Sequence, residues 1–475
     1  MSETQPRVIA VGPMPPEKSA YALARYSRSA DSIRQSIEWV RTHDSAKFLE
    51  SFYFQYGHAS IADLGHLALC FEGISELAAT EIEDEQLWDG QAKSSRYQDF
   101  GKLGVITPPE FSGEEAARYQ AATGALIVAY QEVHRQALES LKEKLPRPED
   151  MKPDAYERNL AARAFDIARY LLPFGVPTNV GQVTSIRTLE KQIRRMKASE
   201  YGELRSLGEE TAAACAREPE CRWDTASSEA IAPTLAKYVD PDTHVAESRA
   251  ALKQWAAQNL SLGGGDSGRV DLLKPTHTAA DIVATLLYGV TQAPYRALYE
   301  TALDWSDARR AEVIDVALAS RTRRDELLAS FRSGPYVYDI PMDIGAYRDL
   351  HRHRRCIQAR QPYSGSSGYV TPKQVVEAKV EGTYRAAMEA AYAVQRSLPE
   401  PGSHYLLPFA ARGRFLFKMD FAEAEYISRL RSGVKGHFSY REVAWAMKER
   451  MVELEPELGR LMKATPPWEE DPLKR

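Results

Sequence analysis

The chain has 475 residues, which is enough for two or three domains with well-filled cores. Apolar residues make up 44% and charged residues 27%, the composition of an ordinary soluble globular protein. The net charge of −5 argues against a general nucleic-acid or membrane coat, so any basic site must be local. Since no apolar run reaches the length of a membrane span and residues 1–18 contain no hydrophobic signal core, we expect a cytoplasmic protein.

The cysteines show no Cys-x-x-Cys spacing and no histidine partner at zinc-finger distance. We therefore expect neither disulfides nor a structural metal. Cys356, which follows a basic stretch, has two interpretations. It is either a thiolate nucleophile with a lowered pKa or, as we favour, a buried helix residue.

Apolar spacing in the first half predicts mostly helices, with a strand at residues 67–71. The last turn of one long helix is closed by Pro173 and Gly175. The expected helices cover residues 21–29, 31–50, 76–86, 114–144, 154–172 and 186–207.

Between residues 232 and 275 the composition changes, and a glycine run appears at residues 262–268. Such a run can cradle a phosphate, but it lacks the preceding strand and the following Lys-Ser/Thr of a P-loop. We interpret this stretch as a linker between two domains.

The second half of the chain repeats the first. Tyr170-Leu-Leu-Pro173 recurs as Tyr405-Leu-Leu-Pro408, each time at the end of a predicted helix. Ser94-Ser-Arg-Tyr97 recurs as Ser366-Ser-Gly-Tyr369. The repetition predicts two copies of one fold.

The two copies differ most at one place. The first copy is acidic at Asp84-Glu-Gln86, whereas the second has Arg352-His-Arg354 within a stretch of three arginines and two histidines at residues 351–355. Repulsion among these groups is tolerable only if an anion or carboxylates lie nearby, and phosphate is the obvious anion. The alternative is a basic helix face in water.

An Arg-His-Arg triplet followed by a spacer and a serine, here Arg352-His-Arg354 and Ser364, resembles the signature of the flavin-dependent thymidylate synthases. The resemblance covers about residues 20–210 and 286–460. It implies an α+β fold with two tandem copies of the flavin-dependent thymidylate synthase fold, in which long helices pack on a small antiparallel sheet. The domains implied are a tail at 1–18, a first copy at 19–235, a linker at 236–280, a second copy at 281–463 and a tail at 464–475.

In the first copy, the resemblance implies flavin contacts from two early segments and one later arginine. Ser27 ends the Ala-Arg-Tyr-Ser segment, and His58 and Ser60 belong to Gly-His-Ala-Ser. Arg187 matches the arginine of an Asn-x-Arg pair, with Ser185 in the usual asparagine position.

The nucleotide side is implied in the first copy as well. Ser94 and Arg96 match a Ser-x-Arg-Tyr segment that reaches deoxyuridylate, and Arg169 matches an arginine that binds its phosphate. Arg195 matches the arginine that the family sets against the uracil ring, and we assign it the catalytic role. There it would stabilise negative charge that grows on a carbonyl oxygen, and we expect Arg195→Ala to lower turnover about a hundredfold.

The second copy keeps a different subset. Arg352, His353 and Arg354 match the triplet that holds flavin, Arg431 matches the uracil-side arginine, and His437 follows it as a further cofactor residue. Other family positions are lost, since His404 replaces the phosphate arginine and Asp420 and Ala422 replace the Asn-x-Arg pair. Such complementary losses are expected if each copy lends one part to a shared site.

The implied reaction is the FAD-dependent methylation of dUMP to dTMP, with methylene-tetrahydrofolate and NADPH as co-substrates. It requires no enzyme nucleophile, which fits a chain without a convincing Cys-His or Ser-His-Asp arrangement. Since ordinary members of the family are homotetramers of a single-copy chain, we expect a homodimer here. We expect no membrane partner and no dedicated nucleic-acid partner.

Two alternatives stay open. The first is a diverged flavoprotein that acts on another pyrimidine nucleotide or is catalytically inactive. The second is weak nucleic-acid binding by a helix at Arg352 and by the 186–207 helix, with Tyr363 and Tyr369 as the nearby aromatic residues available to stack on bases.

Overall fold

The computed structural model describes residues 12, 14–27, 29, 32–49, 59–93, 100–219, 221, 243–262, 273, 275–322, 325–471 and 473. The chain divides into two compact units. Unit 1 comprises Met1–Glu143, Ala164–Pro233 and Ser364–Ala411, and unit 2 comprises Lys144–Arg163, Thr234–Tyr363 and Arg412–Arg475. Each unit takes residues from both halves of the chain, so the units differ from the sequence copies, and the domain boundaries given above stay a prediction.

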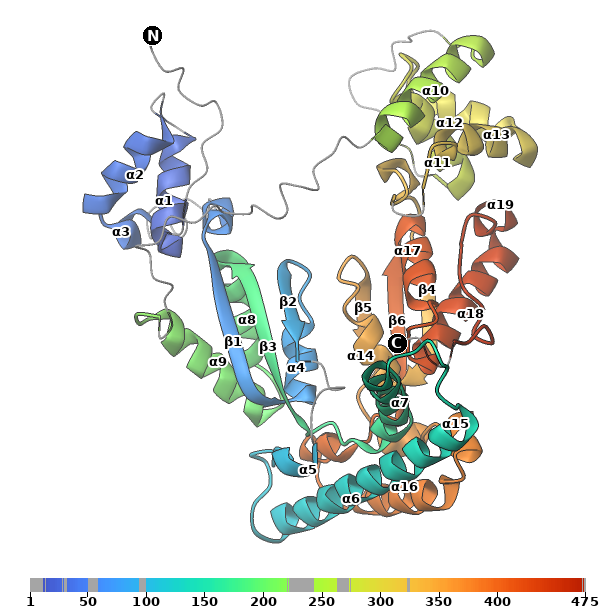
Figure 1. Cartoon of the computed structure of the whole chain (residues 1–475). Helices are drawn as coiled ribbons and strands as arrows, with labels where there is room; N and C mark the ends of the chain where they lie inside the picture. Colours follow the sequence, from blue (N-terminus) through green and yellow to red (C-terminus); the bar gives the residue numbers. More distant parts are fainter. Residues whose placement is uncertain are drawn as a thin grey trace. The chain divides into compact units, whose positions relative to one another are not determined.

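Unit 1 contains a three-stranded antiparallel sheet of β1 (His66–Ser75), β2 (Trp88–Ala92) and β3 (Pro177–Ser185), in the order β1-β3-β2. A helix follows each of the two long strands directly, α4 (Glu76–Glu83) after β1 and α8 (Ile186–Lys197) after β3 (Figure 1). Both helices begin at a serine whose hydroxyl accepts a backbone hydrogen bond, Ser75 from the Ala78 amide and Ser185 from the Thr188 amide.

Unit 2 contains a second sheet with the same plan. It consists of β4 (Tyr336–Asp343), β5 (Ile357–Arg360) and β6 (Arg412–Met419), in the order β4-β6-β5. Again the two long strands lead into helices, α14 (Ile344–Leu350) and α17 (Phe421–Arg431), which are capped by Asp343 and Asp420. The repeated strand order and strand-to-helix connections confirm two tandem copies of one α+β fold.

The remaining helices complete the two units. In the described residues, no helix is both long and apolar enough to cross a membrane. Unit 1 also holds α1 (Pro16–Tyr26), α2 (Ile33–Thr42), α3 (Ser45–Leu49), η2 (Ala59–Leu64), α5 (Phe100–Leu103), η4 (Arg169–Leu171), α9 (Gly202–Cys215), η7 (Gly365–Ser367), α15 (Lys373–Glu377), α16 (Glu381–Gln395) and η8 (Gly402–Leu406). Unit 2 also holds α10 (Thr243–Asn259), α11 (Thr278–Tyr288), α12 (Tyr295–Asp304), α13 (Asp307–Leu318), η6 (Ala329–Phe331), α18 (Phe438–Leu454) and α19 (Pro456–Gly459). At the boundary lie α6 (Gly113–Lys144), whose last residue belongs to unit 2, and α7 (Pro153–Ala168), which is divided between the units.

The repeated Leu-Leu-Pro segments pair with each other inside unit 1. Pro173 and Pro408 form an antiparallel bridge, and the flanking hydrogen bonds come in equivalent pairs. The Phe174 amide donates to the Leu407 carbonyl, and the Phe409 amide donates to the Leu172 carbonyl, both at 2.9 Å. Further out, the Gly175 amide donates to Tyr405 and the Ala410 amide to Tyr170. The two repeated segments are therefore related by a local twofold axis in the structure.

Two of the expected helices are each two α-helices. The helix predicted over residues 31–50 is α2 and α3, with a break at 43–44. The helix predicted over residues 186–207 is two helices, α8 and α9, with a break at 198–201. The Glu110 carboxylate accepts the backbone hydrogen bond of Gly202 at the start of α9, so a residue distant in sequence caps the second helix. Residues 351–355 form a turn between α14 and β5, so the alternative interpretation of this stretch as a basic helix face is wrong.

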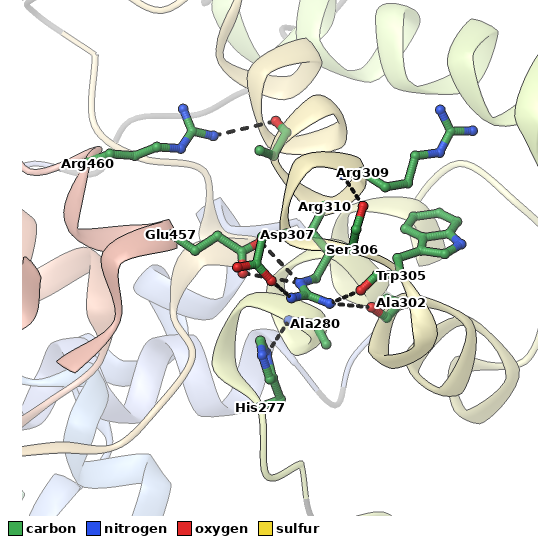
Figure 2. A network of polar contacts seen from close by, with 11 residues as sticks. His277, Ala280, Ala302, Trp305, Ser306, Asp307, Arg309, Arg310, Glu457 and Arg460 are labelled. Carbon is green, nitrogen blue, oxygen red and sulfur yellow. Dashed lines mark hydrogen bonds and ion pairs between the residues drawn. The ribbon is translucent and has the colours of Figure 1, made fainter. Parts of the chain in front are cut away.

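Residues 296–335 contribute α12, α13 and η6 to a helical cluster within unit 2. Its polar centre is Arg310, whose side chain is only 4% exposed. Arg310 Nε donates to both carboxylate oxygens of Glu457 at 3.1 and 3.2 Å, and Nη1 donates to the Ala302 carbonyl at 3.1 Å (Figure 2). Asp307 accepts from Nη2. The network ties this helical cluster to α19 near the end of the chain.

Candidate functional site

The basic turn at residues 351–355 has carboxylates beside it, as its charge requires. Asp349 lies one turn earlier on α14, and Asp420 and Glu423 lie in the first turn of α17. Arg352 Nη2 is 2.9 Å from Asp349, and Arg355 is 3.6 Å from Asp420 and 3.4 Å from Glu423. The cluster is therefore balanced by the protein's own acids as well as being open to an added anion.

His353 occupies the centre of this cluster, between an acid and an arginine. Its ring is buried; Nδ1 lies 3.3 Å from Glu423 Oε1, and Nε2 accepts a hydrogen bond from Arg431 Nε at 2.7 Å. An arginine can only donate, so Nε2 carries no proton and Nδ1 is the protonated nitrogen. Burial lowers the pKa of His353, and the neighbouring Arg431 and Arg352 charges lower it further, against an opposing effect of Glu423. His353 is therefore neutral at neutral pH.

Glu423 is a carboxylate with only 2% of its surface exposed. Three features surround its side chain. It lies in the first turn of α17, where the helix dipole favours an anion, and it faces both the Nδ1–H group of His353 and the Arg355 guanidinium. The equivalent position in α8 is Thr188, so this acid belongs to the second copy alone.

Arg431 lies at the end of α17 and is partly buried. Its Nε is bound to His353, and its guanidinium lies over the ring of Tyr440 at 5.8 Å. Among the described residues, neither Nη1 nor Nη2 makes a hydrogen bond or an ion pair. Burial and the nearby Arg352 lower the pKa of Arg431, although an arginine remains charged at any physiological pH. The terminal nitrogens can therefore serve as a bidentate donor for an oxygen ligand.

The residues that the family resemblance assigns to flavin fit that ligand to different degrees. The Arg352 side chain is 52% exposed and is held by one surface ion pair, so its guanidinium can turn to a diphosphate. Arg354 lies partly buried in the same turn. His353 does not fit direct flavin contact in this arrangement, because its ring is buried and both of its nitrogens face protein groups.

His437 is also buried. Its Nδ1 accepts the backbone hydrogen bond of Ser439 and thereby caps α18. The geometry gives this residue a structural role within unit 2, and its predicted cofactor contact stays a prediction.

In the first copy, Arg187 forms an ion pair with Asp63 of η2. Arg187 Nη1 lies 2.9 Å from Asp63 Oδ2, and Ser185 Oγ lies 3.4 Å from Asp63 Oδ1. Ser60 is exposed in the same short helix as Asp63, η2, and Ser27 ends α1, which packs against η2. The structure therefore brings Ser60 and Arg187, two of the predicted flavin residues, to one part of unit 1.

Arg195 is held by acidic and carbonyl groups. Its Nη1 donates to the Glu81 carbonyl at 2.7 Å, and its Nη2 lies 3.7 Å from Glu85. Both terminal nitrogens thus face protein oxygens. In the described chain, Arg195 Nη2 makes no hydrogen bond, whereas neither terminal nitrogen of Arg431 makes a hydrogen bond or an ion pair.

The predicted phosphate residue Arg169 lies in η4 and is buried. Its counterpart His404 is buried as well, with Nδ1 2.9 Å from the Tyr201 hydroxyl. Ser94, Arg96 and His58 lie outside the described residues. The predicted shared site joins residues of different units and also stays a prediction.

Cys356 is buried directly before β5, outside any helix. Burial raises the pKa of its thiol, with Glu423 and Asp420 adding to the effect, which removes the nucleophile interpretation. Tyr363 is buried, and the Tyr369 hydroxyl donates to Glu389. Since residues 351–355 form no helix and Tyr363 cannot stack on a base, the nucleic-acid alternative loses two of its premises.

Comparison with known proteins identifies the family. The profile of the thymidylate synthase complementing proteins matches residues 10–218 and again residues 290–457. The chain therefore belongs to this family, which is the flavin-dependent thymidylate synthase family expected from the sequence, and it contains two copies of the family's domain.

The similar proteins and solved structures share a quarter or less of the aligned residues with this chain. A UPF0159 protein of Chlamydia muridarum is 25% identical over 454 residues, which cover 88% of this chain and 81% of the relative. A UPF0159 protein of Thermoplasma acidophilum is 25% identical over 488 residues, which cover 93% and 94%. A crystal structure of thymidylate synthase X from Helicobacter pylori with FAD and dUMP covers 41% of this chain and 86% of its own, at 16% identity and a TM-score of 0.27.

Glu423 is the site residue that sequence reasoning missed. The available signal was an acid three residues after Asp420, next to the positions that correspond to the family's Asn-x-Arg pair. Its partner His353 is 70 residues away in the chain, so the pairing itself appears only in the fold.

Proposed function

We propose that this protein methylates C5 of a uracil nucleotide, converting dUMP to dTMP, with FAD as cofactor and methylene-tetrahydrofolate and NADPH as co-substrates. The observation that carries the proposal is the family match over both copies. The geometry adds an arginine, Arg431, whose two terminal nitrogens are available to a ligand.

Each named ligand carries anionic groups, and the chain's arginines suit them. Arg352 and Arg354 would hold the FAD diphosphate, and Arg169 remains the proposed residue for the nucleotide phosphate. When bound, reduced FAD supplies the hydride that completes the methyl group. Arg431 and Arg195 are the two candidates for stabilising negative charge on a uracil carbonyl oxygen while C5 forms its new bond.

The proposal is tested by the visible spectrum of the purified protein, followed by dUMP-dependent NADPH oxidation and chromatographic detection of dTMP. We expect a flavin spectrum, or its appearance after addition of FAD, and dTMP formation that requires all three substrates. A colourless protein that FAD does not reconstitute would contradict the proposal.

A second candidate is a flavin-binding homologue without thymidylate synthase activity. It is favoured by the acids that occupy the second copy, where Asp420 stands in the family's asparagine position and Glu423 is buried beside the triplet. Flavin binding without dUMP dependence in the same assay would select this candidate.

We also propose that the chain forms a homodimer, because two chains would then supply the four domain copies of an ordinary family tetramer. Light scattering of the purified protein measures its mass directly. A monomeric mass would exclude this assembly.

A further inference from the structure

We infer that Glu423 and His353 are positioning residues, which orient Arg431 so that its two terminal nitrogens bind oxygen atoms of the nucleotide. The inference rests on the proposed function for the identity of that ligand. It gives His353 a role different from the flavin contact that the family resemblance implies.

The first step is the direction of the hydrogen bonds. Glu423 can only accept, so the Nδ1–H group of His353 points to it, and Nε2 is left as an acceptor for Arg431 Nε. Glu423 thus selects the tautomer that can hold an arginine. Without the carboxylate, the proton can move to Nε2, where it would face the Nε–H group of Arg431.

The second step is what this contact does to the guanidinium. The group is planar, so fixing Nε through His353 also fixes the plane and direction of Nη1 and Nη2. Those two nitrogens have no protein acceptor in the described part of unit 2. The guanidinium is therefore fixed at Nε by the protein, while Nη1 and Nη2 can bind a ligand with two oxygens or one polarised carbonyl.

The third step concerns the surroundings of the histidine. Arg352 and Arg431 are the cations near the ring, Glu423 is the anion, and the Tyr426 ring packs edge-on against it at 5.8 Å. Arg355 neutralises the other side of the Glu423 carboxylate at 3.4 Å. These charges let a buried carboxylate persist beside a neutral imidazole, which a purely apolar packing role for His353 would not need.

The test compares Glu423→Gln and Arg431→Lys with the unaltered protein. The first change keeps the shape but removes the charge that selects the tautomer, and the second keeps the charge but removes the fork. Arg414→Gln is the matched control, because Arg414 forms an exposed ion pair with Asp339 on the sheet of the same unit.

Binding of dUMP is measured by calorimetry and binding of FAD by flavin fluorescence. Both site variants should weaken dUMP binding roughly tenfold and change FAD binding by less than about twofold, and the control should change neither.

A second readout does not depend on catalysis. In protein labelled with ¹⁵N-histidine, the His353 ring signals, identified by their loss in His353→Gln, should show a neutral ring protonated at Nδ1 near neutral pH. Glu423→Gln should shift them toward the other tautomer.

Three results would overturn the inference. One is an FAD affinity that falls as much as the dUMP affinity, since the pair would then serve flavin. Another is an imidazolium, or the Nε2–H tautomer, in the unaltered protein. The last is a dUMP affinity that the two site variants leave unchanged, or an unaltered protein that does not bind dUMP. Failure of the proposed function looks different: dTMP does not form, while dUMP affinity and the histidine spectrum still decide the positioning role.

Discussion

The two copies share a backbone plan and differ in the chemistry placed on it. Ten residues after the cap of α4 lies Glu85, and ten residues after the cap of α14 lies His353. Each of these two residues contacts an arginine near the end of the helix that follows the second long strand of its copy. Glu85 lies 3.7 Å from Arg195 Nη2 on α8, and His353 Nε2 lies 2.7 Å from Arg431 Nε on α17. The acid approaches a terminal nitrogen of its arginine, whereas the neutral histidine binds Nε and leaves both terminal nitrogens without a partner in the described chain. With different partners, Arg195 is paired through its terminal nitrogens and Arg431 through Nε.

The layer between sheet and helix differs in the same way. In the first copy, Gln182 on β3 and Gln192 on α8 exchange a buried hydrogen bond at 2.9 Å, and Gln192 also donates to the Ile82 carbonyl. The equivalent positions in the second copy are Phe417 and Ile427, both buried. A fully satisfied polar pair and an apolar pair therefore support the same topology.

The equivalence of the copies is tested most strongly at the local twofold axis. Phe174 and Phe409 are fully buried and meet edge-to-face at 6.3 Å. Each change to alanine should lower the free energy of unfolding by about 3–5 kcal/mol, because each leaves a cavity of the same size. Urea unfolding of both variants measures this. A clearly smaller loss at one position would show that the axis is not energetically symmetric.

The functional contrast is tested by Arg431→Ala and Arg195→Ala, with dTMP formation as the measurement. Removing the fork of Arg431 should lower turnover about a hundredfold, as expected for loss of an oxyanion donor. An equal loss in Arg195→Ala would confirm the assignment made from sequence and place both copies in the reaction. A loss of less than about tenfold in Arg195→Ala would assign the role of oxyanion donor to Arg431 of the second copy.

The caps of α4 and α14 offer a test by exchange. In the first copy the Ser75 hydroxyl donates to the Glu203 carboxylate at 2.6 Å, and in the second the Ser439 hydroxyl donates to the Asp343 carboxylate. Ser75→Asp places two carboxylates together and should cost about 2 kcal/mol of unfolding free energy. Adding Glu203→Ser recreates the arrangement of the second copy. Urea unfolding measures the stability of both variants. A double variant no more stable than Ser75→Asp would show that the two cap arrangements are not interchangeable.

The smallest expected effect is a pH dependence confined to the second copy. The pKa of His353 is lowered in the folded protein, mainly by burial, below its ordinary value of about 6.5. As the pH falls below that value, the unfolded chain binds a proton that the folded chain resists, so folding is weakened. Between about pH 7 and pH 5, the unaltered protein should therefore lose stability relative to His353→Gln. Parallel stability curves for the two proteins would contradict a buried neutral histidine.

The sequence predicted the features that depend on local pattern. The strand at 67–71, the helix over 114–144 and the duplication marked by Leu-Leu-Pro all appear in the fold. Features set by distant partners could not be predicted. The start of α9 after the break is capped by Glu110, and Glu423 contributes to the charge balance of the basic turn. Both are single carboxylates whose partners are brought to them only by folding.

The junction between the copies has a consequence for how such a duplicated chain can evolve. Its hydrogen bonds join amides and carbonyls around Pro173 and Pro408, groups that every residue except proline supplies in full. Mutation of side chains therefore leaves the register of this pairing intact. Side chains can therefore differ between the copies, as Arg169 differs from its counterpart His404 and Ser185 from its counterpart Asp420, while the backbone pairing that relates the copies is kept.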